Sequence, residues 1–387
     1  MSRRAVVVGA GIGGAAAALA LRRQGWGVTL LERASSAREL GFALLMAPNA
    51  VRALGALGVA DAVLTQSVAS GLVEMRRPDG RVLRRMDGGR LREALGEDTV
   101  CVLRPVVLGA LLEALGDDVL KLGVRARSYV REGGAVVVTA DDGSRHRGDI
   151  VVGADGIRST IRAQLLGDSP PHYAGFVAWR GVARGVARQL GALTGAQYLG
   201  RAREAGLALA APDHVYWFLA TPMPPGALDP SDARAGLDHA LEPFHEPFRA
   251  VVDATAAEAL RRDEIWDRDP VSAWGDGPVT LLGDAAHPMP PNAGQGAAQA
   301  LEDAVVLGHC LGGLEDPVAA LRRYERARMQ RTAAIVKLSR DNARMFLVQA
   351  RAAVILRDLA IRALPERFVV SRLAAISKAD LAPDLRA

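Results

Sequence analysis

Three short glycine-containing segments carry the residue types best suited to chemistry. Residues 9–14 read GAGIGG, residues 152–159 read VGADGIRS, and residues 283–296 read GDAAHPMPPNAGQG. Each begins in or directly after a short run of β-branched and aliphatic residues, which is typical of a buried strand. Glycine lets a backbone turn sharply or approach a ligand closely, whereas aspartate and arginine bind polar ligand groups. We therefore expect a ligand site built from segments that lie far apart in the sequence.

The first segment matches the pattern G-x-G-x-x-G. A strand is predicted before it, a helix after it, and a second strand over residues 28–31. In such a unit Gly9 permits the tight turn, Gly11 lets the backbone approach a pyrophosphate, and Gly14 lets the helix pack closely on the sheet. The phosphates would then lie at a helix N-terminus. The alternative is a glycine-rich turn with no ligand.

Glu32 supports the ligand interpretation. It closes the second predicted strand, where a carboxylate can accept hydrogen bonds from an adenosine ribose. Its negative charge would repel a ribose 2′-phosphate. The sequence therefore predicts that this unit binds FAD or NAD and not NADP.

Length and composition narrow the class of protein. A chain of 387 residues with 50% hydrophobic residues predicts two or three folded domains. The net charge of +5 is small, and the arginines are scattered without interleaved aromatic residues. We therefore expect no nucleic-acid partner.

The order of predicted elements indicates an α/β fold. It comprises a Rossmann-like, discontinuous domain that would bind FAD or NAD (below, the FAD-binding domain), a discontinuous and mainly β substrate domain, and a C-terminal helical region. A Pro-Asp-Gly turn at residues 78–80 predicts a hairpin that leaves the parallel sheet. The expected boundaries are residues 1–70, 97–171 and 267–315 for the FAD-binding domain, 71–96 and 172–266 for the substrate domain, and 316–387 for the helices.

The cysteines and the apolar runs predict a cytoplasmic protein. Cys101 and Cys310 have no metal-like spacing, so we expect neither a metal site nor a disulfide framework. No uninterrupted stretch of 18 apolar residues occurs, so no membrane span is expected. The richness in Ala, Gly and Arg suggests a bacterial source.

Taken in order, the three segments resemble those of the single-component FAD-dependent aromatic hydroxylases, the class A flavoprotein monooxygenases of the p-hydroxybenzoate and salicylate hydroxylase type. The resemblance runs over about residues 5–335. Residues 176–181 resemble the branch that includes urate hydroxylases and carotenoid epoxidases. The resemblance implies bound FAD, NADPH or NADH as a transient reductant, and molecular oxygen. It also implies hydroxylation or epoxidation of an aromatic or polycyclic small molecule through a flavin C4a-hydroperoxide.

The resemblance also implies roles for residues at the flavin. Asp284 would bind the ribityl chain, and the helix that begins at Gly296 or Ala297 would direct its positive end to the flavin ring. Asp155 and Arg158 would serve both FAD and the nicotinamide, although a plain turn and helix cap is the alternative. The cofactor-binding candidates are Gly9, Gly11, Gly13, Gly14, Glu32, Arg33, Arg38, Arg104, Asp155, Arg158, Asp284, Pro291, Gly294, Gly296 and Ala297.

No side chain is assigned to catalysis with certainty, because the flavin would carry the chemistry. The candidates are Arg180, Tyr216 and His287. Arg180 either meets an anionic substrate or braces a sheet, and His287 either transfers protons or organises the backbone. The candidates for the substrate pocket, each of which could equally be core, are Leu45, Phe176, Trp179, Tyr216, Phe218, Met223, Met289 and Pro290.

Two other functions fit the same segments. A flavin-dependent reductase of an isoprenoid or other unsaturated substrate would need no oxygen, and an antibiotic-inactivating hydroxylase would share the chemistry. The Trp-x-Trp-x-Ile-Pro segment of flavin-dependent halogenases does not occur in the sequence. The apolar candidates favour a bicyclic or larger aromatic substrate, and the chain is expected to be a monomer or a homodimer.

Overall fold

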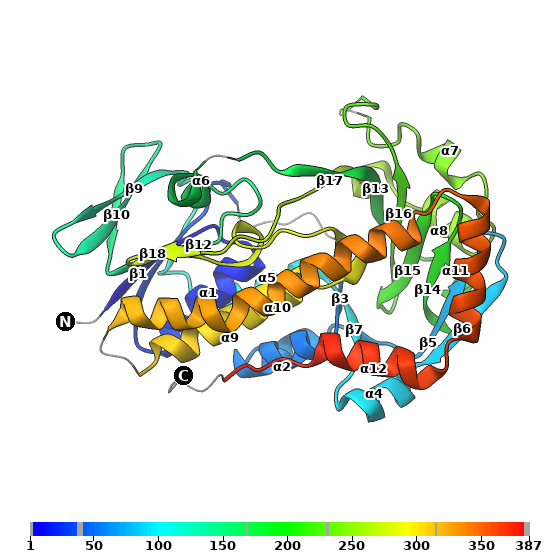
Figure 1. The fold of residues 1–387 in the computed structure, drawn as a ribbon, viewed down its shortest axis with the longest axis horizontal. Helices are drawn as coiled ribbons and strands as arrows, with labels where there is room; N and C mark the ends of the chain where they lie inside the picture. Colours follow the sequence, from blue (N-terminus) through cyan, green and yellow to red (C-terminus); the bar gives the residue numbers. More distant parts are fainter. Residues whose placement is uncertain (1–2, 37–41, 168, 230–231, 314–315, 383–387) are drawn as a thin grey trace.

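A parallel sheet forms one end of the molecule (Figure 1). The computed structural model describes residues 3–36, 42–167, 169–229, 232–313 and 316–382. The sheet has the order β18-β19-β12-β1-β2-β8, and all neighbours are parallel except β18 and β19. Its strands are β1 (Arg4–Val8), β2 (Gly27–Leu31), β8 (Leu120–Lys121), β12 (Ile150–Gly153), β18 (Gly275–Asp276) and β19 (Val279–Leu281).

Two helices packed side by side cover this sheet. They are α1 (Ile12–Arg23) and α9 (Gly296–Leu311). Small residues allow the close approach: a Cβ on Gly13 would lie 3.1 Å from the Cβ of Ala300, and a Cβ on Gly308 would lie 2.9 Å from that of Ala20. Because both contacts advance along both helices in the same direction, the helices are parallel and their N-termini lie at the same end.

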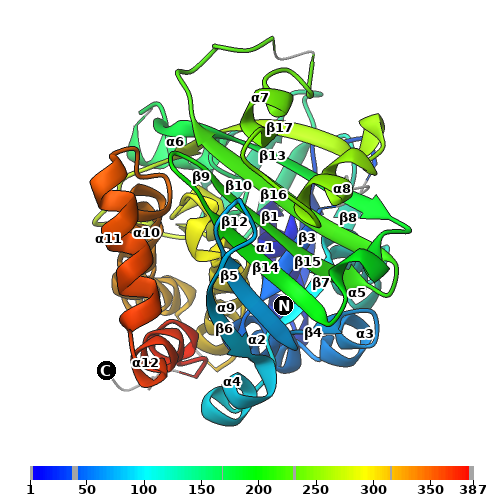
Figure 2. The same ribbon diagram turned by 90° about the vertical axis from the view of Figure 1, so that its right-hand side faces the viewer.

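A seven-stranded sheet forms the other end of the molecule (Figure 2). Its order, β17-β13-β16-β15-β14-β5-β6, joins residues 72–87 to strands that begin only at residue 172. The hairpin expected around residues 78–80 is present as β5 and β6. The strands are β5 (Leu72–Arg76), β6 (Val82–Asp87), β13 (His172–Arg184), β14 (Leu193–Leu199), β15 (Glu204–Ala211), β16 (His214–Pro222) and β17 (Leu260–Asp267).

The two faces of this sheet have different neighbours. On the outer face, Trp217 and Tyr198 pack in an apolar core with α7 (Leu237–Leu241) and α8 (Phe248–Asp253). The rings of Trp217 and Phe248 meet edge to face with centroids 6.2 Å apart. The inner face is turned toward the rest of the chain, so it is the face that can contribute to a site between the sheets.

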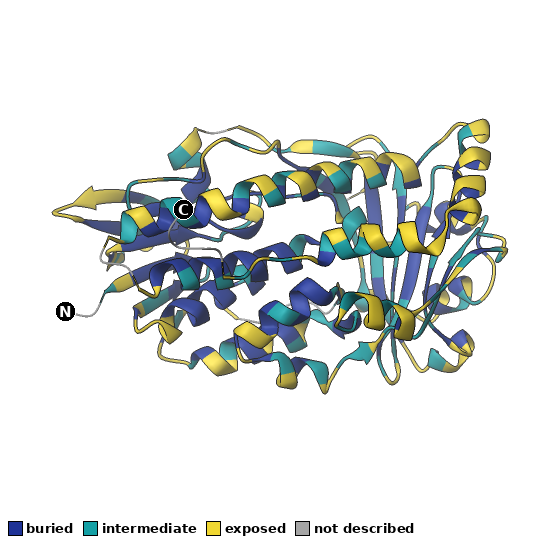
Figure 3. Ribbon diagram, turned by 60° about the horizontal axis from the view of Figure 1, so that its bottom comes forward, coloured by how far each residue is buried: buried dark blue, intermediate teal, exposed yellow. Residues whose placement is uncertain are grey.

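Long C-terminal helices connect the two ends. After α9, Asp316 caps α10 (Pro317–Phe346), and α11 (Arg351–Ala363) follows. Through Ala343 and Leu347, α10 also covers part of the inner sheet face. Figure 3 shows that α9 is largely buried, whereas α11 and α12 (Glu366–Ser377) are widely exposed.

The remaining elements are short. They are the sheet of β3 (Ala43–Met46), β7 (Val100–Leu103) and β4 (Val68–Ala69), the sheet of β9 (Ala126–Glu132), β10 (Ala135–Ala140) and β11 (Arg145–Gly148), the helices α2 (Pro48–Ala56), α3 (Ala60–Leu64), α4 (Gly88–Leu95), α5 (Arg104–Leu115) and α6 (Thr160–Leu166), and the helical turns η1 (Ala187–Leu190), η2 (Ala257–Ala259), η3 (Gly283–Ala285) and η4 (Pro291–Ala293). Within the described ranges, every helix is too short or too polar to cross a membrane.

The outer-face core gives a stability prediction. Phe248 is fully buried, so Phe248→Ala should lower the free energy of unfolding by about 3–5 kcal/mol through lost burial and a residual cavity. Urea unfolding followed by circular dichroism measures the change. Phe368→Ala is the control, because Phe368 is 57% exposed, and it should change stability little. Equal effects of the two substitutions would contradict this description of the core.

Candidate cofactor and substrate site

The three glycine-containing segments meet at one edge of the parallel sheet. Val8 of β1 pairs with Gly153 of β12, and Gly153 pairs with Leu281 of β19. Each segment therefore leaves its strand at the same level, at the carboxyl edge. Ligands of open α/β sheets bind at this edge, so the arrangement brings together the segments that the sequence suggested.

The glycines of the first segment have distinct steric roles. Gly9 has φ +98°, and a Cβ there would lie 2.5 Å from the carbonyl oxygen of Ala154. A Cβ on Gly14 would lie 1.8 Å from the carbonyl oxygen of Gly9. A Cβ on Gly11 would meet no atom within 4 Å, and its φ of −67° is open to any residue. Packing thus explains Gly9 and Gly14, whereas Gly11 leaves room for a ligand.

The N-termini of α1 and α9 are suited to bind anionic groups. Neither Gly11 nor Gln295, which precede these helices, makes a side-chain cap, and neither first turn holds an acidic residue among the described positions. The first amide groups of both helices therefore keep their hydrogen-bonding capacity. Because the helices are parallel, the positive ends of both dipoles lie on the same side. A pyrophosphate and an anionic flavin ring fit these two ends.

Glu32 lies next to the first segment, as expected. Its Oε2 accepts a hydrogen bond from the amide of Ala10 at 2.8 Å, and its Oε1 accepts one from the amide of Ala34 at 2.9 Å. The carboxylate is thus fixed beside the glycine turn, where it can also accept from a ribose hydroxyl. Arg33, the next residue, is exposed.

Asp284 lies within electrostatic range of Arg104 and His287. Its side chain is accessible to solvent, yet burial by surrounding atoms raises its pKa, while the charges of His287 and Arg104 act in the opposite direction. Two predicted cofactor residues, one after β19 and one at the start of α5, therefore lie close enough to interact electrostatically.

The middle segment has a structural role that its sequence left open. Both carboxylate oxygens of Asp155 are bound within the turn: Oδ1 accepts from Ser159 Oγ at 2.5 Å and Oδ2 from the amide of Thr160 at 2.7 Å. Ser159, not Arg158, caps α6 by accepting from the amide of Arg162. Arg158 is exposed. The expected contacts of Asp155 and Arg158 with cofactors stay predictions.

Arg162 is an organising residue that the sequence analysis missed. Its guanidinium is buried and donates from Nη1 to the carbonyls of Ala285 and Ala286 at 2.9 and 3.0 Å. Burial, together with nearby Arg268, lowers its pKa to about 10. Arg162 therefore ties the middle segment to the third one. Its position four residues after Arg158 gave no sign of this contact.

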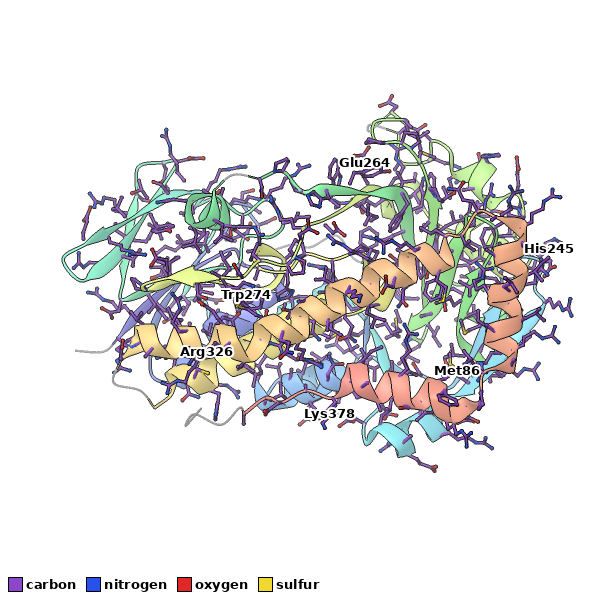
Figure 4. The ribbon with its side chains drawn as sticks, in the orientation of Figure 1. Met86, His245, Glu264, Trp274, Arg326 and Lys378 are labelled. Carbon is purple, nitrogen blue, oxygen red and sulfur yellow. The ribbon has the colours of Figure 1, made fainter. Side chains whose placement is uncertain are left out.

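His287 is part of a buried ionic network. Its Nε2 lies 2.6 Å from Asp303 Oδ2, and the same oxygen accepts the amide of Gly283. Trp274, labelled in Figure 4, stacks on the imidazole with ring centroids 5.3 Å apart. Burial raises the pKa of Asp303, but His287 and Arg328 outweigh it and hold the pKa at about 2. This geometry supports the backbone-organising role of His287.

Arg328 on α10 completes the network with groups that the sequence analysis did not single out. Its Nε donates to Asp303 Oδ1 at 2.7 Å and its Nη1 to Glu302 Oε2 at 2.5 Å. Glu302 also binds Arg331 and Asn49. Adjacent acidic residues inside an Ala-rich helix were the available signal, because such residues are rarely buried without partners.

Possible substrate-contacting residues lie on the inner face of the seven-stranded sheet. Tyr216 packs with Cys101 and Ala43 of the small sheet, and its ring lies 6.5 Å from that of Phe218. Burial raises the pKa of Tyr216 to about 12. Leu45 pairs with Cys101 and thus shares its face, yet it is 51% exposed. The seven-stranded sheet therefore contributes an aromatic ring, Tyr216, where it meets the small sheet, and the small sheet contributes an exposed aliphatic side chain, Leu45.

Two pocket candidates prove to be core residues. Trp179 pairs with Leu219 and is fully buried in the outer-face core, and Met223 packs against the same core. The reason is the alternation of a strand: Trp179 and Arg180 point to opposite faces. Both side chains thus match the core alternative that the sequence left open, and a contact of either one with substrate stays a prediction.

The other candidates have mixed environments. Arg180 lies on the inner face, where it forms an ion pair with Asp263 at 3.3 Å, so it braces β13 against β17. Phe176 packs against α10 and, together with Pro290, lines a cleft of about 380 Å³. Met289 is half-buried. Their contacts with substrate stay predictions.

The last cofactor candidates flank the start of α9. Gly294 has φ +62°, and neither Gly294 nor Gly296 has an atom within 4 Å of a Cβ position. Pro291 is exposed and Ala297 half-buried. Gly13 packs between Leu282 and Ala300, which gives it a role in helix packing. Arg38 lies outside the described residues. The open glycines, the uncapped helices and the exposed Asp284 together fit an FAD molecule.

Comparison with known proteins agrees with this geometry. Residues 3–339 match the family described as FAD binding domain. The chain belongs to this family. It is 36% identical over 331 residues to the aurachin C monooxygenase/isomerase of Stigmatella aurantiaca, covering 84% of this chain and 85% of the relative.

Further comparisons extend over the whole fold. The chain is 31% identical over 342 residues to the FAD-dependent urate hydroxylase of Klebsiella pneumoniae, covering 87% of this chain and 88% of the relative. The crystal structure of Klebsiella pneumoniae HpxO complexed with FAD and uric acid matches with a TM-score of 0.91 at 28% identity, covering 97% and 96% of the two chains. The resemblance to FAD-dependent hydroxylases and the FAD cofactor are thereby confirmed.

The different roles of Gly11 and Gly14 give a matched pair of variants. Gly11→Ala should leave the stability of the FAD-free protein within about 0.5 kcal/mol of wild type. It should raise the dissociation constant of FAD by roughly tenfold or more, because the methyl group enters the ligand space. Gly14→Ala should itself destabilise the FAD-free protein by about 2 kcal/mol. Thermal unfolding and fluorescence titration with FAD measure both effects, and normal FAD affinity in Gly11→Ala would refute the pyrophosphate assignment.

The ionic network gives a second prediction. Arg328→Met should lower the free energy of unfolding by about 3–5 kcal/mol, because Asp303 and Glu302 would keep buried charges without this partner. The control is Arg344→Met, which removes an exposed ion pair with Asp341 and should change stability little. Denaturant unfolding of the FAD-free proteins compares the two. A small loss in Arg328→Met would show that the network does not stabilise the fold.

Proposed function

We propose that the chain is an FAD-dependent monooxygenase that hydroxylates or epoxidises an aromatic or polycyclic small molecule with electrons from NADPH or NADH. The observation that carries this proposal is the position of the flavin-binding edge between the parallel sheet and the aromatic inner face of the second sheet. Relatives named as a monooxygenase and a hydroxylase cover most of the chain, which supports the same activity. When bound, FAD supplies electron transfer and oxygen activation.

The protein residues have tasks of binding and positioning. The N-terminal amides of α1 hold the pyrophosphate, Asp284 binds the ribityl chain, and the N-terminus of α9 stabilises negative charge at the flavin ring. Tyr216 and Phe218 offer apolar surface against which a flat substrate can lie, and they exclude water from it. The hydroxyl of Tyr216 is neutral near pH 7, as an ordinary tyrosine is, and burial raises its pKa further to about 12, so it can donate a hydrogen bond.

The surroundings of Tyr216 favour an uncharged substrate larger than a benzoate. Arg180, whose charge acts on Tyr216, is already paired with Asp263. A bicyclic or larger heteroaromatic compound fits such a surface better than a small anion. We further propose a cytoplasmic enzyme acting as a monomer or homodimer in secondary metabolism or aromatic degradation. The two free and buried cysteines are consistent with a reducing compartment.

The deciding experiment follows NAD(P)H oxidation by the FAD-loaded protein, with and without oxygen, in the presence of bicyclic aromatic compounds. A monooxygenase should consume NAD(P)H in a substrate-stimulated manner, and oxygen uptake and an oxygenated product should accompany it. A reduced product formed without oxygen would instead identify a flavin-dependent reductase.

Asp284→Ala tests the placement of the cofactor in the same assay. Loss of the ribityl contact should lower FAD content and turnover markedly. Glu325→Ala provides the control, because Glu325 is buried on α10 beside β19 and binds Thr280 and Arg322. Wild-type flavin content and rate in Asp284→Ala would contradict the assignment.

A further inference from the structure

A buried carboxyl connects the seven-stranded sheet to the loop before α9. Glu204, the first residue of β15, is 2% exposed. Its Oε1 accepts a hydrogen bond from Nε2 of Gln197 on β14 at 2.9 Å, and its Oε2 accepts one from Nδ2 of Asn292 at 2.6 Å. Asn292 lies in η4, between the cofactor-binding candidates Pro291 and Gly294. Glu204 therefore joins the proposed substrate sheet directly to residues 288–296, which we call the flavin-side loop.

Asn292 is also held from the opposite side. Its backbone carbonyl accepts a hydrogen bond from Nδ2 of Asn342 on α10 at 3.1 Å. Its side-chain Oδ1 is buried and has no hydrogen-bond partner among the described residues. The side chain thus depends on Glu204 for its one hydrogen bond in this region. Because Glu204 lies on the sheet and Asn292 lies in the loop, this bond ties η4 to the substrate sheet.

The pKa of Glu204 depends on its burial, on its hydrogen bonds and on the nearby charge of Arg357. Arg357 on α11 is the ionised group that acts on it, and Arg357 is itself bound to Asp358 at 2.9 Å and to the carbonyls of Leu199 and Gly200. Burial raises the pKa of Glu204 to about 7, although the hydrogen bonds from Gln197 and Asn292 and the charge of Arg357 act to lower it. Changes of pH near 7 therefore alter the protonation of Glu204.

We propose that Glu204 is a positioning residue for the flavin-side loop: its carboxylate binds Asn292 and holds η4 against the substrate sheet, and its protonation loosens η4. The chemistry follows from the donors. A proton on Oε2 would face the Asn292 amino group, so two donors would oppose each other. Rotation of the Asn292 amide would bring Oδ1 to accept this proton, but the resulting neutral bond is weaker than the charge-assisted one. The proposal rests on the proposed function only in assigning η4 to the flavin.

The test compares the wild type with Glu204→Gln at pH 6 and pH 8. Hydrogen exchange of the FAD-free proteins over residues 288–296, corrected for intrinsic rates, reports on the loop without any enzymatic activity. In the wild type, exchange should be faster at pH 6, and the dissociation constant of FAD should be roughly fivefold higher than at pH 8. Glu204→Gln is neutral at both pH values and can make only the weaker neutral hydrogen bonds, so neither quantity should change between pH 6 and pH 8.

Two further variants complete the design. Glu204→Ala should increase exchange over residues 288–296 at both pH values. Glu325→Gln is the matched control, because Glu325 is also buried and has a raised pKa but binds Thr280 and Arg322 near β19. It should keep the pH dependence of the wild type. The same pH dependence in Glu204→Gln as in the wild type, or unchanged exchange in Glu204→Ala, would overturn the proposal. Loop loosening without catalytic activity would support it while refuting the proposed function.

Discussion

The register of three parallel strands determines where the site lies. Val8, Gly153 and Leu281 are aligned across β1, β12 and β19, so the chain leaves the sheet at the same level three times. Two of the departures lead to helices that begin without side-chain caps, after Gly11 and Gln295. A shift of one residue in either pairing would separate the segments and turn buried side chains outward. The cofactor site thus depends on the same backbone bonds that form the sheet.

A layer of buried charge keeps this edge in place. Asp303 and Glu302 on α9 bind Arg328 on α10, and Asp303 also binds His287 and the amide of Gly283. Such pairs are expensive to desolvate and add little stability over an apolar core, but their geometry is specific. The network therefore fixes the path of the third segment, including the start of the turn that holds Asp284. Arg162 has a similar role from the other side through Ala285 and Ala286.

Local patterns predicted the parts of the site that depend on the backbone. The glycine turn, Glu32 and the position of Asp284 at a strand end followed from sequence alone, because each is set by neighbours in the chain. Arg162 and Arg328 could not be found in this way, since their partners lie more than twenty residues away. On the seven-stranded sheet, neighbouring residues of one strand, such as Trp217 and Phe218, must point to opposite faces. Which side meets the cofactor depends on the pairing of β13 with β16, which no local pattern specifies.

One FAD molecule is expected to lie across the carboxyl edge, with its pyrophosphate at the N-terminus of α1 and its ring beside the N-terminus of α9. A crystal structure of the chain with FAD tests this placement. Phosphate oxygens should lie within hydrogen-bonding distance of the amides that follow Gly11, and the flavin ring should lie alongside residues 291–296. FAD bound elsewhere, or a side chain of the protein filling the space next to Gly11, would contradict it.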